Sequence, residues 1–244
     1  MSESVFLLAS SIIFVSFFVR ALTGFGAGLI GIPLLALFWE VSFVVPMQLL
    51  LEIGLSVLLL PKVHKDVDYR HVGNLALGMF VGNLTGSMVL ANFEGRILKL
   101  ALAVVVLSFS IYLAVTAGRP NRWRIPHKWG GLFGLCGGFF GGAFGMSGPI
   151  VMLYLAQQIH DKTRLRATVI ALFFFASTWT AFMHWANGLY RLESMRVLAM
   201  LTPAFLLGTR LGHWAHFRVS EVLFRRIIAA ILLGSSIMLM IWKG

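Results

Sequence analysis

Long apolar stretches, separated by short polar connectors, fill the chain almost from end to end. Most of these stretches approach the roughly 20 residues that an α-helix needs to cross the hydrocarbon core of a bilayer. Ten segments can be delimited: 4–22, 24–39, 42–61, 72–91, 98–118, 129–143, 147–157, 167–187, 195–214 and 226–242. The pattern predicts an all-α polytopic membrane protein with about eight to ten membrane segments.

The order of features along the chain occurs twice. A glycine-rich break at 23–28, Thr-Gly-Phe-Gly-Ala-Gly, returns about 120 positions later at 143–149 as Ala-Phe-Gly-Met-Ser-Gly-Pro, and three apolar segments follow each break. The polar, basic segment 119–128 contains two prolines and forms a natural boundary between the copies. We therefore expect two transmembrane repeats, residues 1–118 and 129–244, joined by a basic linker at 119–128.

The first two segments of each repeat allow two interpretations. Segment 4–22 is long enough to span a bilayer, whereas 129–143 and 147–157 are short. Each pair therefore forms either two full spans or a broken, re-entrant hairpin. Both arrangements keep the glycine break away from lipid, because each unpaired backbone group in hydrocarbon costs several kcal/mol.

The basic residues predict the orientation, provided that the first two segments of each repeat enter and leave on one side. Four connectors then face the cytoplasm and carry 13 of the 20 Lys and Arg residues, against five outside. These connectors are 62–71, 119–128, 158–166 and 215–226. The N-terminus is therefore expected outside and the linker in the cytoplasm. Because each repeat crosses an odd number of times, the two repeats are expected to be inverted relative to each other.

The composition narrows the class of protein. With 59% apolar residues, 12% charged residues and a mean hydropathy of +0.88, the chain has too little polar surface for a water-soluble globule. Its formal charge of +11 lies in short connectors rather than on one face, so no nucleic-acid partner is expected. The single cysteine, Cys136, provides no thiolate cluster, and no nucleophile elbow, metalloprotease histidine pair or phosphate-loop motif occurs. The sequence predicts neither an enzyme nor a metal site or cofactor.

The two glycine breaks are candidate anion-binding elements. In the second break, Ser147 can cap a helix and Pro149 suits its first turn, so a helix is expected to start near mid-membrane. The free amides of that helix and the positive end of its dipole favour an anion. The other interpretation is that the glycines only let helices pack tightly. The candidate substrate contacts in the breaks are Thr23, Gly24, Phe25, Gly26, Gly145, Met146, Ser147 and Gly148.

Ionisable residues within the apolar segments are a second clue, because charge at membrane depth is costly and is typical of functional sites. Arg20 immediately precedes the first break and is expected either to bind the oxygens of an anion or to snorkel to the headgroups. Glu52, with Gln48 one turn earlier on the same face, is expected to carry a proton or to pair with an arginine. Arg210 has the weaker functional case, since its side chain can reach the interface.

Two further pairs of glycines match the pattern of closely packed membrane helices. Gly82 and Gly86 lie in the first repeat, and Gly208 and Gly212 take a similar place in the second. Glycines four residues apart leave a groove into which a neighbouring backbone fits. We expect both pairs to serve helix packing rather than substrate binding.

Residues 20–33 (Arg-Ala-Leu-Thr-Gly-Phe-Gly-Ala-Gly-Leu-Ile-Gly-Ile-Pro) and 137–149 (Gly-Gly-Phe-Phe-Gly-Gly-Ala-Phe-Gly-Met-Ser-Gly-Pro) together resemble the sulfite exporter (TauE/SafE) family of bacterial permeases. The likeness covers essentially the whole chain. It implies a multi-pass protein of the bacterial inner membrane that transports sulfur-containing anions such as sulfite or organosulfonates. It also implies that both breaks face the permeation route.

The residues and the resemblance together favour a secondary transporter that binds a small anion between the two breaks, with the halves rocking to give alternating access. The alternatives are an anion channel, a transporter of another small organic anion such as a carboxylate, and a non-transporting membrane assembly factor. The sequence leaves open the direction of transport, the coupling ion and the formation of a homodimer.

Overall fold

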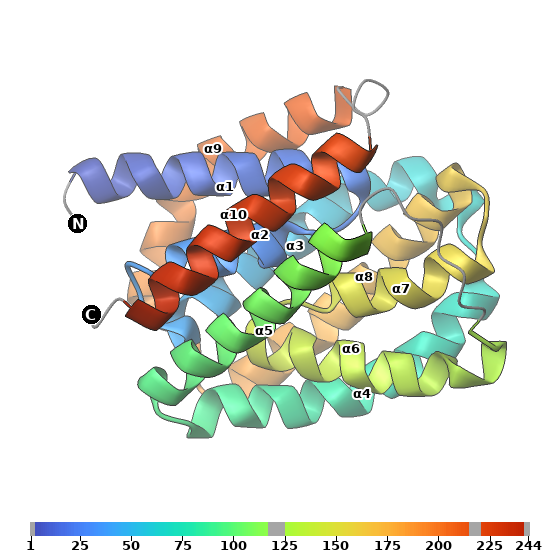
Figure 1. Cartoon of the computed structure of the whole chain (residues 1–244), viewed down its shortest axis with the longest axis horizontal. Coiled ribbons are helices and arrows are strands. Elements are labelled where there is room, and N and C mark those ends of the chain that lie inside the picture. Colours follow the sequence, from blue (N-terminus) through green and yellow to red (C-terminus); the bar gives the residue numbers. More distant parts are fainter. Residues whose placement is uncertain (1–2, 117–124, 215–220, 242–244) are drawn as a thin grey trace.

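The computed structural model describes residues 3–116, 125–214 and 221–241, and all regular structure in these ranges is helical (Figure 1). The helices of the first half are α1 (Glu3–Thr23), α2 (Ala27–Leu35), α3 (Val41–Val63), α4 (Tyr69–Asn92) and α5 (Gly95–Thr116). Those of the second half are α6 (Gly130–Phe144), α7 (Gly148–Gln158), α8 (Lys162–Ala186), α9 (Leu192–Trp214) and α10 (Glu221–Ile241). Short 3₁₀ turns, η1 (His64–Asp66) and η2 (His127–Trp129), precede α4 and α6. Each half thus supplies five α-helices in the predicted order, and part of the predicted linker, 119–124, lies outside the described residues.

The helices have the length and the surface of membrane spans. Within the described residues, α1, α3, α4, α5 and α8 are long and apolar enough to cross a bilayer. Large apolar side chains also face outward along the bundle, as Leu77 of α4 and Trp214 of α9 illustrate, with 74% and 72% of their surface exposed. Such a surface suits lipid rather than water. The chain is an all-α, polytopic membrane protein.

The segment 129–157 forms a hairpin, which resolves for this half the choice that the sequence left open. α7 has 11 residues and is about 17 Å long, too short for a hydrocarbon core of about 30 Å. α6 and α7 fold back on each other, with Gly137 against Val151 and the rings of Phe133 and Tyr154 5.6 Å apart. In the first half, α2 has only nine residues and turns back beside α1 in the same way (Figure 1).

Connectors from the two halves meet at each end of the molecule. At one end, the connector before α9 meets the connector before α3, and the Arg191 guanidinium lies 3.7 Å from the Glu40 carboxylate. At the opposite end, the backbone N–H of Asp68 donates to the hydroxyl of Thr168 at 3.0 Å. The described parts of connectors 62–71 and 158–166 therefore share one end, as the predicted topology requires, while the side that faces the cytoplasm stays a prediction.

Two glycine-lined contacts between helices, which we call the glycine seams, hold the bundle together. In the first, a side chain at Gly82 or Gly86 of α4 would collide with the carbonyl oxygen of Leu135 or Phe139 of α6. In the second seam, Gly208 and Gly212 of α9 lie equally close to the backbone carbonyls of α1. The prediction that both glycine pairs serve helix packing is confirmed.

The seams interlock the two halves. α1 and α6, the first helices of their halves, pack on α9 and α4, the fourth helices of the opposite halves. α3 packs on α8 and α5 on α10, so helices of the same rank also pair across the halves. Each of these helix pairs has a counterpart with the roles of the two halves exchanged, or is its own counterpart. This symmetry supports the prediction of a repeat. The halves are nevertheless interlocked rather than being two separate bundles.

Candidate functional site

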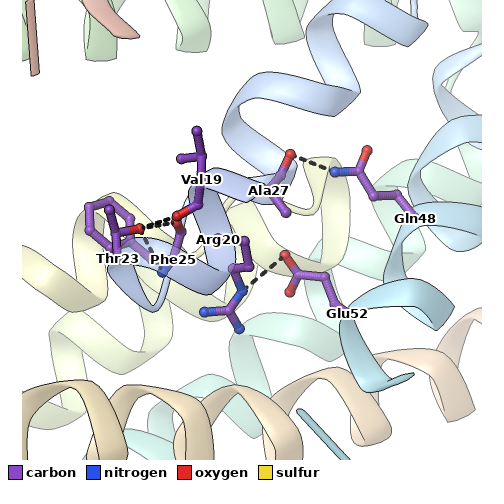
Figure 2. A network of polar contacts seen from close by, with 7 residues as sticks. All are labelled: Val19, Arg20, Thr23, Phe25, Ala27, Gln48 and Glu52. Atoms are coloured by element: carbon purple, nitrogen blue, oxygen red, sulfur yellow. Dashed lines mark hydrogen bonds and ion pairs between the residues drawn. The ribbon is translucent and has the colours of Figure 1, made fainter. Parts of the chain in front are cut away.

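The first helix break closes on its own residues. Gly24 and Gly26 have φ angles of 92° and 104°, in the left-handed region that glycine adopts without strain. The hydroxyl of Thr23 lies 2.9 Å from the carbonyl oxygen of Val19 and 2.7 Å from that of Phe25, and it accepts the N–H of Phe25 at 3.3 Å (Figure 2). These bonds end α1 and turn the chain into α2.

The second break is closed by backbone groups. Gly145 follows α6 with a φ of 62°, its N–H donates to the carbonyl of Gly141, and the N–H of Met146 donates to that of Phe140. Ser147 stands at the N-cap position, immediately before α7, but its side chain makes no capping hydrogen bond, in contrast to the sequence-based expectation. The reason is that its backbone is already helical, whereas a capping residue is usually extended.

The structure brings the two breaks into contact. A side chain at Gly28 would collide with the carbonyl oxygen of Gly145, and one at Gly148 would lie 3.3 Å from the ring of Phe25. Between the breaks lies a cavity with room for about one water molecule. Its lining comprises Arg20, Gly26, Gly28, Leu29, Glu52, Gly145, Met146, Ser147, Gly148, Pro149 and Phe173. We call this the arginine cavity.

Arg20 is the charged centre of this cavity. Its side chain is only 1% exposed, and its Nε lies 3.8 Å from Oε1 of Glu52 (Figure 2). The ring of Phe173 lies under the guanidinium, with its centroid 4.7 Å from Cζ. None of the three guanidinium nitrogens has a hydrogen-bond partner among the described residues. Because buried N–H groups are normally hydrogen-bonded, these free donors indicate a place for an acceptor ligand.

α3 supplies two side chains that face the start of α2. The Nε2 of buried Gln48 donates to the carbonyl of Ala27 at 2.5 Å (Figure 2). The Gly28 amide faces the carboxylate of Glu52. Residues 48 and 52 are one helical turn apart, so both reach the same short helix. Gln48 therefore fixes the position of α2, while Glu52 meets both the helix start and Arg20.

A second polar cavity adjoins the first and shares Glu52, Gly145 and Ser147 with it. The rest of its lining is uncharged and consists of Leu49, Met79, Asn83, Gly141, Ala176, Ser177 and Thr180. Asn83 is only 1% exposed, and its Oδ1 has no hydrogen-bond partner among the described residues. We call this the amide cavity. It extends the polar region from the breaks toward α4 and α8.

The structure gathers some of the predicted site residues and separates others. Those that line the arginine cavity are Arg20, Gly26, Glu52, Gly145, Met146, Ser147 and Gly148. Thr23, Gly24 and Phe25 do not line it, because they form the turn and the packing behind it. Gln48 binds the backbone of α2 instead. Arg210 lies exposed on α9 and lines neither cavity.

Sequence reasoning missed three residues. Phe173 carries no signal in a chain with 21 phenylalanines. Asn83 is a polar residue at membrane depth, but it lies inside the glycine pair that was assigned to packing. Arg166 was assigned to a connector, whereas its Nη2 donates to the carbonyl of Ala21 at 2.6 Å, next to the first break.

The chain is similar over nearly its whole length to proteins of one family. The sequence model of the family described as "Sulfite exporter TauE/SafE" matches residues 8–239. A curated protein of Cupriavidus necator, named "Probable sulfite/organosulfonate exporter TauE", is 26% identical over 230 residues, which cover 92% of this chain and 89% of that protein. No solved structure matches the chain.

Proposed function

Because the chain belongs to the sulfite exporter TauE/SafE family, we propose that it carries a small sulfur oxyanion, such as sulfite or an organosulfonate, across the bacterial inner membrane. Family membership and the apolar helices identify a multi-pass membrane transporter. In our proposal the anion binds in the arginine cavity, between two inverted repeats. The basic connectors face the cytoplasm and the N-terminus lies outside.

The observation that carries this proposal is the buried guanidinium of Arg20 in the arginine cavity, which has Glu52 nearby but no hydrogen-bond acceptor among the described residues. A guanidinium presents several N–H donors in a plane, and a sulfonate or sulfite group presents several oxygens that accept them. Arg20 is buried and its hydrogen-bond donors have no partner in the described part of the chain, so an oxyanion satisfies groups that are otherwise costly to bury. A snorkelling arginine would instead extend to the headgroups.

The two helix starts supply the rest of the site. Gly28 in the first turn of α2 and Gly148 at the start of α7 both line the arginine cavity. First-turn amides have no partner within their own helix, and the helix dipole places partial positive charge there. Glycine at these positions lets an oxyanion approach the backbone closely. The repeated breaks thus act together on one ligand.

The described conformation leaves little space in the arginine cavity. The arginine cavity has room for about one water molecule, which is less than a sulfonate group occupies. Binding and release therefore require the lining helices to separate, as alternating access demands. Because the glycine seams join helices of opposite halves, we propose that the moving bodies each contain helices from both halves.

The proposal is tested by ligand-dependent thermal stability of the purified protein and by flux into liposomes. Sulfite and methanesulfonate are expected to raise the unfolding temperature, since a ligand of the folded state stabilises it. Arg20→Lys keeps the charge but loses the planar fork, and we expect it to weaken binding by about tenfold or more. Arg210→Lys is the matched control and is expected to bind like the unchanged protein, because Arg210 is exposed.

Full binding by Arg20→Lys and by Ser147→Ala would show that the anion binds elsewhere. Single-channel currents would identify an anion channel instead of a transporter. Stronger stabilisation by acetate than by methanesulfonate would indicate a carboxylate transporter. A protein that no anion stabilises and that moves none would fit a membrane assembly factor.

A further inference from the structure

We propose that Glu52 is an internal competitor for the anion position, and that an anion binding to Arg20 displaces the Glu52 carboxylate into the amide cavity with uptake of one proton. This inference rests on the proposed function of the arginine cavity. It adds that the site is regulated by its own carboxylate and that binding of the anion is linked to protonation.

Glu52 already occupies the place that an anion needs. Its carboxylate lies 3.8 Å from Nε of Arg20 and faces the amide of Gly28. These are the donors that we assign to a transported oxyanion. The arginine cavity has room for about one water molecule, and two negative groups so close together repel each other strongly. The anion and the ionised Glu52 therefore exclude each other.

The structure offers the displaced side chain a second position. Glu52 lines both cavities, so a rotation of its side chain moves the carboxyl group from Arg20 toward Asn83. Asn83 is buried, and its Oδ1 is an acceptor without a partner among the described residues. A protonated carboxyl group donates its O–H to such an oxygen, whereas an ionised carboxylate has no proton to donate. The amide cavity therefore fits the neutral form of Glu52.

The charges around Glu52 favour the same exchange. Arg20 of α1 is the charged group that acts on Glu52 in the described part of the chain, and Arg166 of α8 acts on Arg20. The other side chains that face the two cavities from α4, from the second break with α7, and from α8 are neutral: Met79, Asn83, Ser147, Pro149, Phe173, Ala176, Ser177 and Thr180. Once an anion holds Arg20, the carboxylate has lost its compensating cation, and a buried unpaired carboxylate takes up a proton.

The exchange balances in charge. Before binding, the site contains a guanidinium and a carboxylate; afterwards it contains a guanidinium, the bound monovalent anion and a neutral carboxylic acid. The proton comes from solvent and bonds to a carboxylate oxygen of Glu52, and no other bond changes. The net charge of the occupied and the empty site is therefore the same.

Methanesulfonate is the probe that tests this linkage, because it is the anion of a strong acid and keeps one negative charge throughout the measurement. Its Kd for the full chain in detergent is expected to fall as the pH is lowered, by up to about tenfold per pH unit wherever Glu52 is ionised in the free protein and neutral in the complex. A pH indicator in weak buffer should register about one proton taken up per anion bound. A Kd that is independent of pH, without proton uptake, would overturn the inference.

Glu52→Gln removes the competitor while keeping the size of the side chain. We expect tighter methanesulfonate binding at neutral pH, no dependence on pH and no proton uptake. Glu40→Gln, at an exposed connector, is the matched control and should bind like the unchanged protein. If Glu52→Gln fails to fold, the two measurements on the unchanged protein decide alone.

The outcomes separate this inference from the proposed function. If no anion binds at any pH, the proposed function itself fails. A second outcome is that Arg20→Lys weakens methanesulfonate binding, whereas neither pH nor Glu52→Gln changes it. The anion site then stands, and the competition by Glu52 is wrong.

Discussion

The two helix breaks have related backbones but different chemistry. The first contains two left-handed glycines and is closed by a hydroxyl. Arg20 precedes it on α1, and Gln48 and Glu52 of α3 contact its neighbours Ala27 and Arg20. The second has one left-handed glycine and is closed by backbone bonds, and Ser147 is its polar side chain in the cavity. The comparison indicates a division of roles, in which the first break supplies the charge and the second supplies backbone and a close fit.

The largest expected effect comes from separating the breaks. Gly28→Ala places a methyl group against the carbonyl of Gly145, so the breaks must move apart. We expect a loss of about 1–3 kcal/mol in the free energy of unfolding, together with loss of anion binding. Thermal unfolding and methanesulfonate binding in detergent measure both.

Gly131→Ala is the matched control for this change. Gly131 also lies in a helix, α6, but an added methyl group there meets open space. Its substitution should leave anion binding intact and keep or slightly raise stability. Equal behaviour of the two variants would mean that the contact between the breaks does not hold the site.

A smaller effect separates the two hydroxyl groups. Thr23→Val removes the bonds that close the first break and should lower the free energy of unfolding by about 1 kcal/mol. Ser147→Ala removes a hydroxyl that caps nothing, so stability should stay nearly unchanged while anion binding weakens. Thermal unfolding and the same binding assay distinguish them. If Ser147→Ala is the more destabilised variant, the proposed division of roles is reversed.

The smallest effect is expected where the halves meet at the surface. Arg191 and Glu40 lie 3.7 Å apart, but both side chains are more than half exposed. Solvent and salt screen such a pair, so Arg191→Ala should change the free energy of unfolding by less than about 0.5 kcal/mol. Thermal unfolding at low and high salt is the measurement. A loss as large as that of Gly28→Ala would show that the surface, rather than the breaks, joins the halves.

The sequence predicted the helices and their order because apolar length is a strong signal in a membrane protein. It also predicted that the breaks act together, since a repeated feature points to one shared site. The choice between spans and a hairpin was beyond it, because the short segments 129–143 and 147–157 fit both. The observed helix ends decide it, because α7 has only 11 residues and is too short to cross a bilayer.

The individual site residues were harder to predict than the site. Whether a break residue lines a cavity or closes a turn depends on neighbours distant in sequence, so Thr23 and Gly26 looked equivalent and are not. Phe173 acts through its position under Arg20, which no local pattern encodes. Asn83 was not predicted because it lies between Gly82 and Gly86, and the sequence pattern of these glycines indicated helix packing, which the structure bears out.

The glycine seam between α1 and α9 has a consequence for biosynthesis. α1 leaves the ribosome before α9, and seven α-helices lie between them in the chain order. Arg20 and Glu52, however, belong to α1 and α3, so the buried guanidinium can meet its carboxylate while the second half is still being translated. A paired arginine is tolerated in a nascent membrane bundle better than an isolated one. Insertion of the first helices therefore does not have to wait for the seam, and completion of the proposed anion site waits only for the second break and for Phe173 of α8.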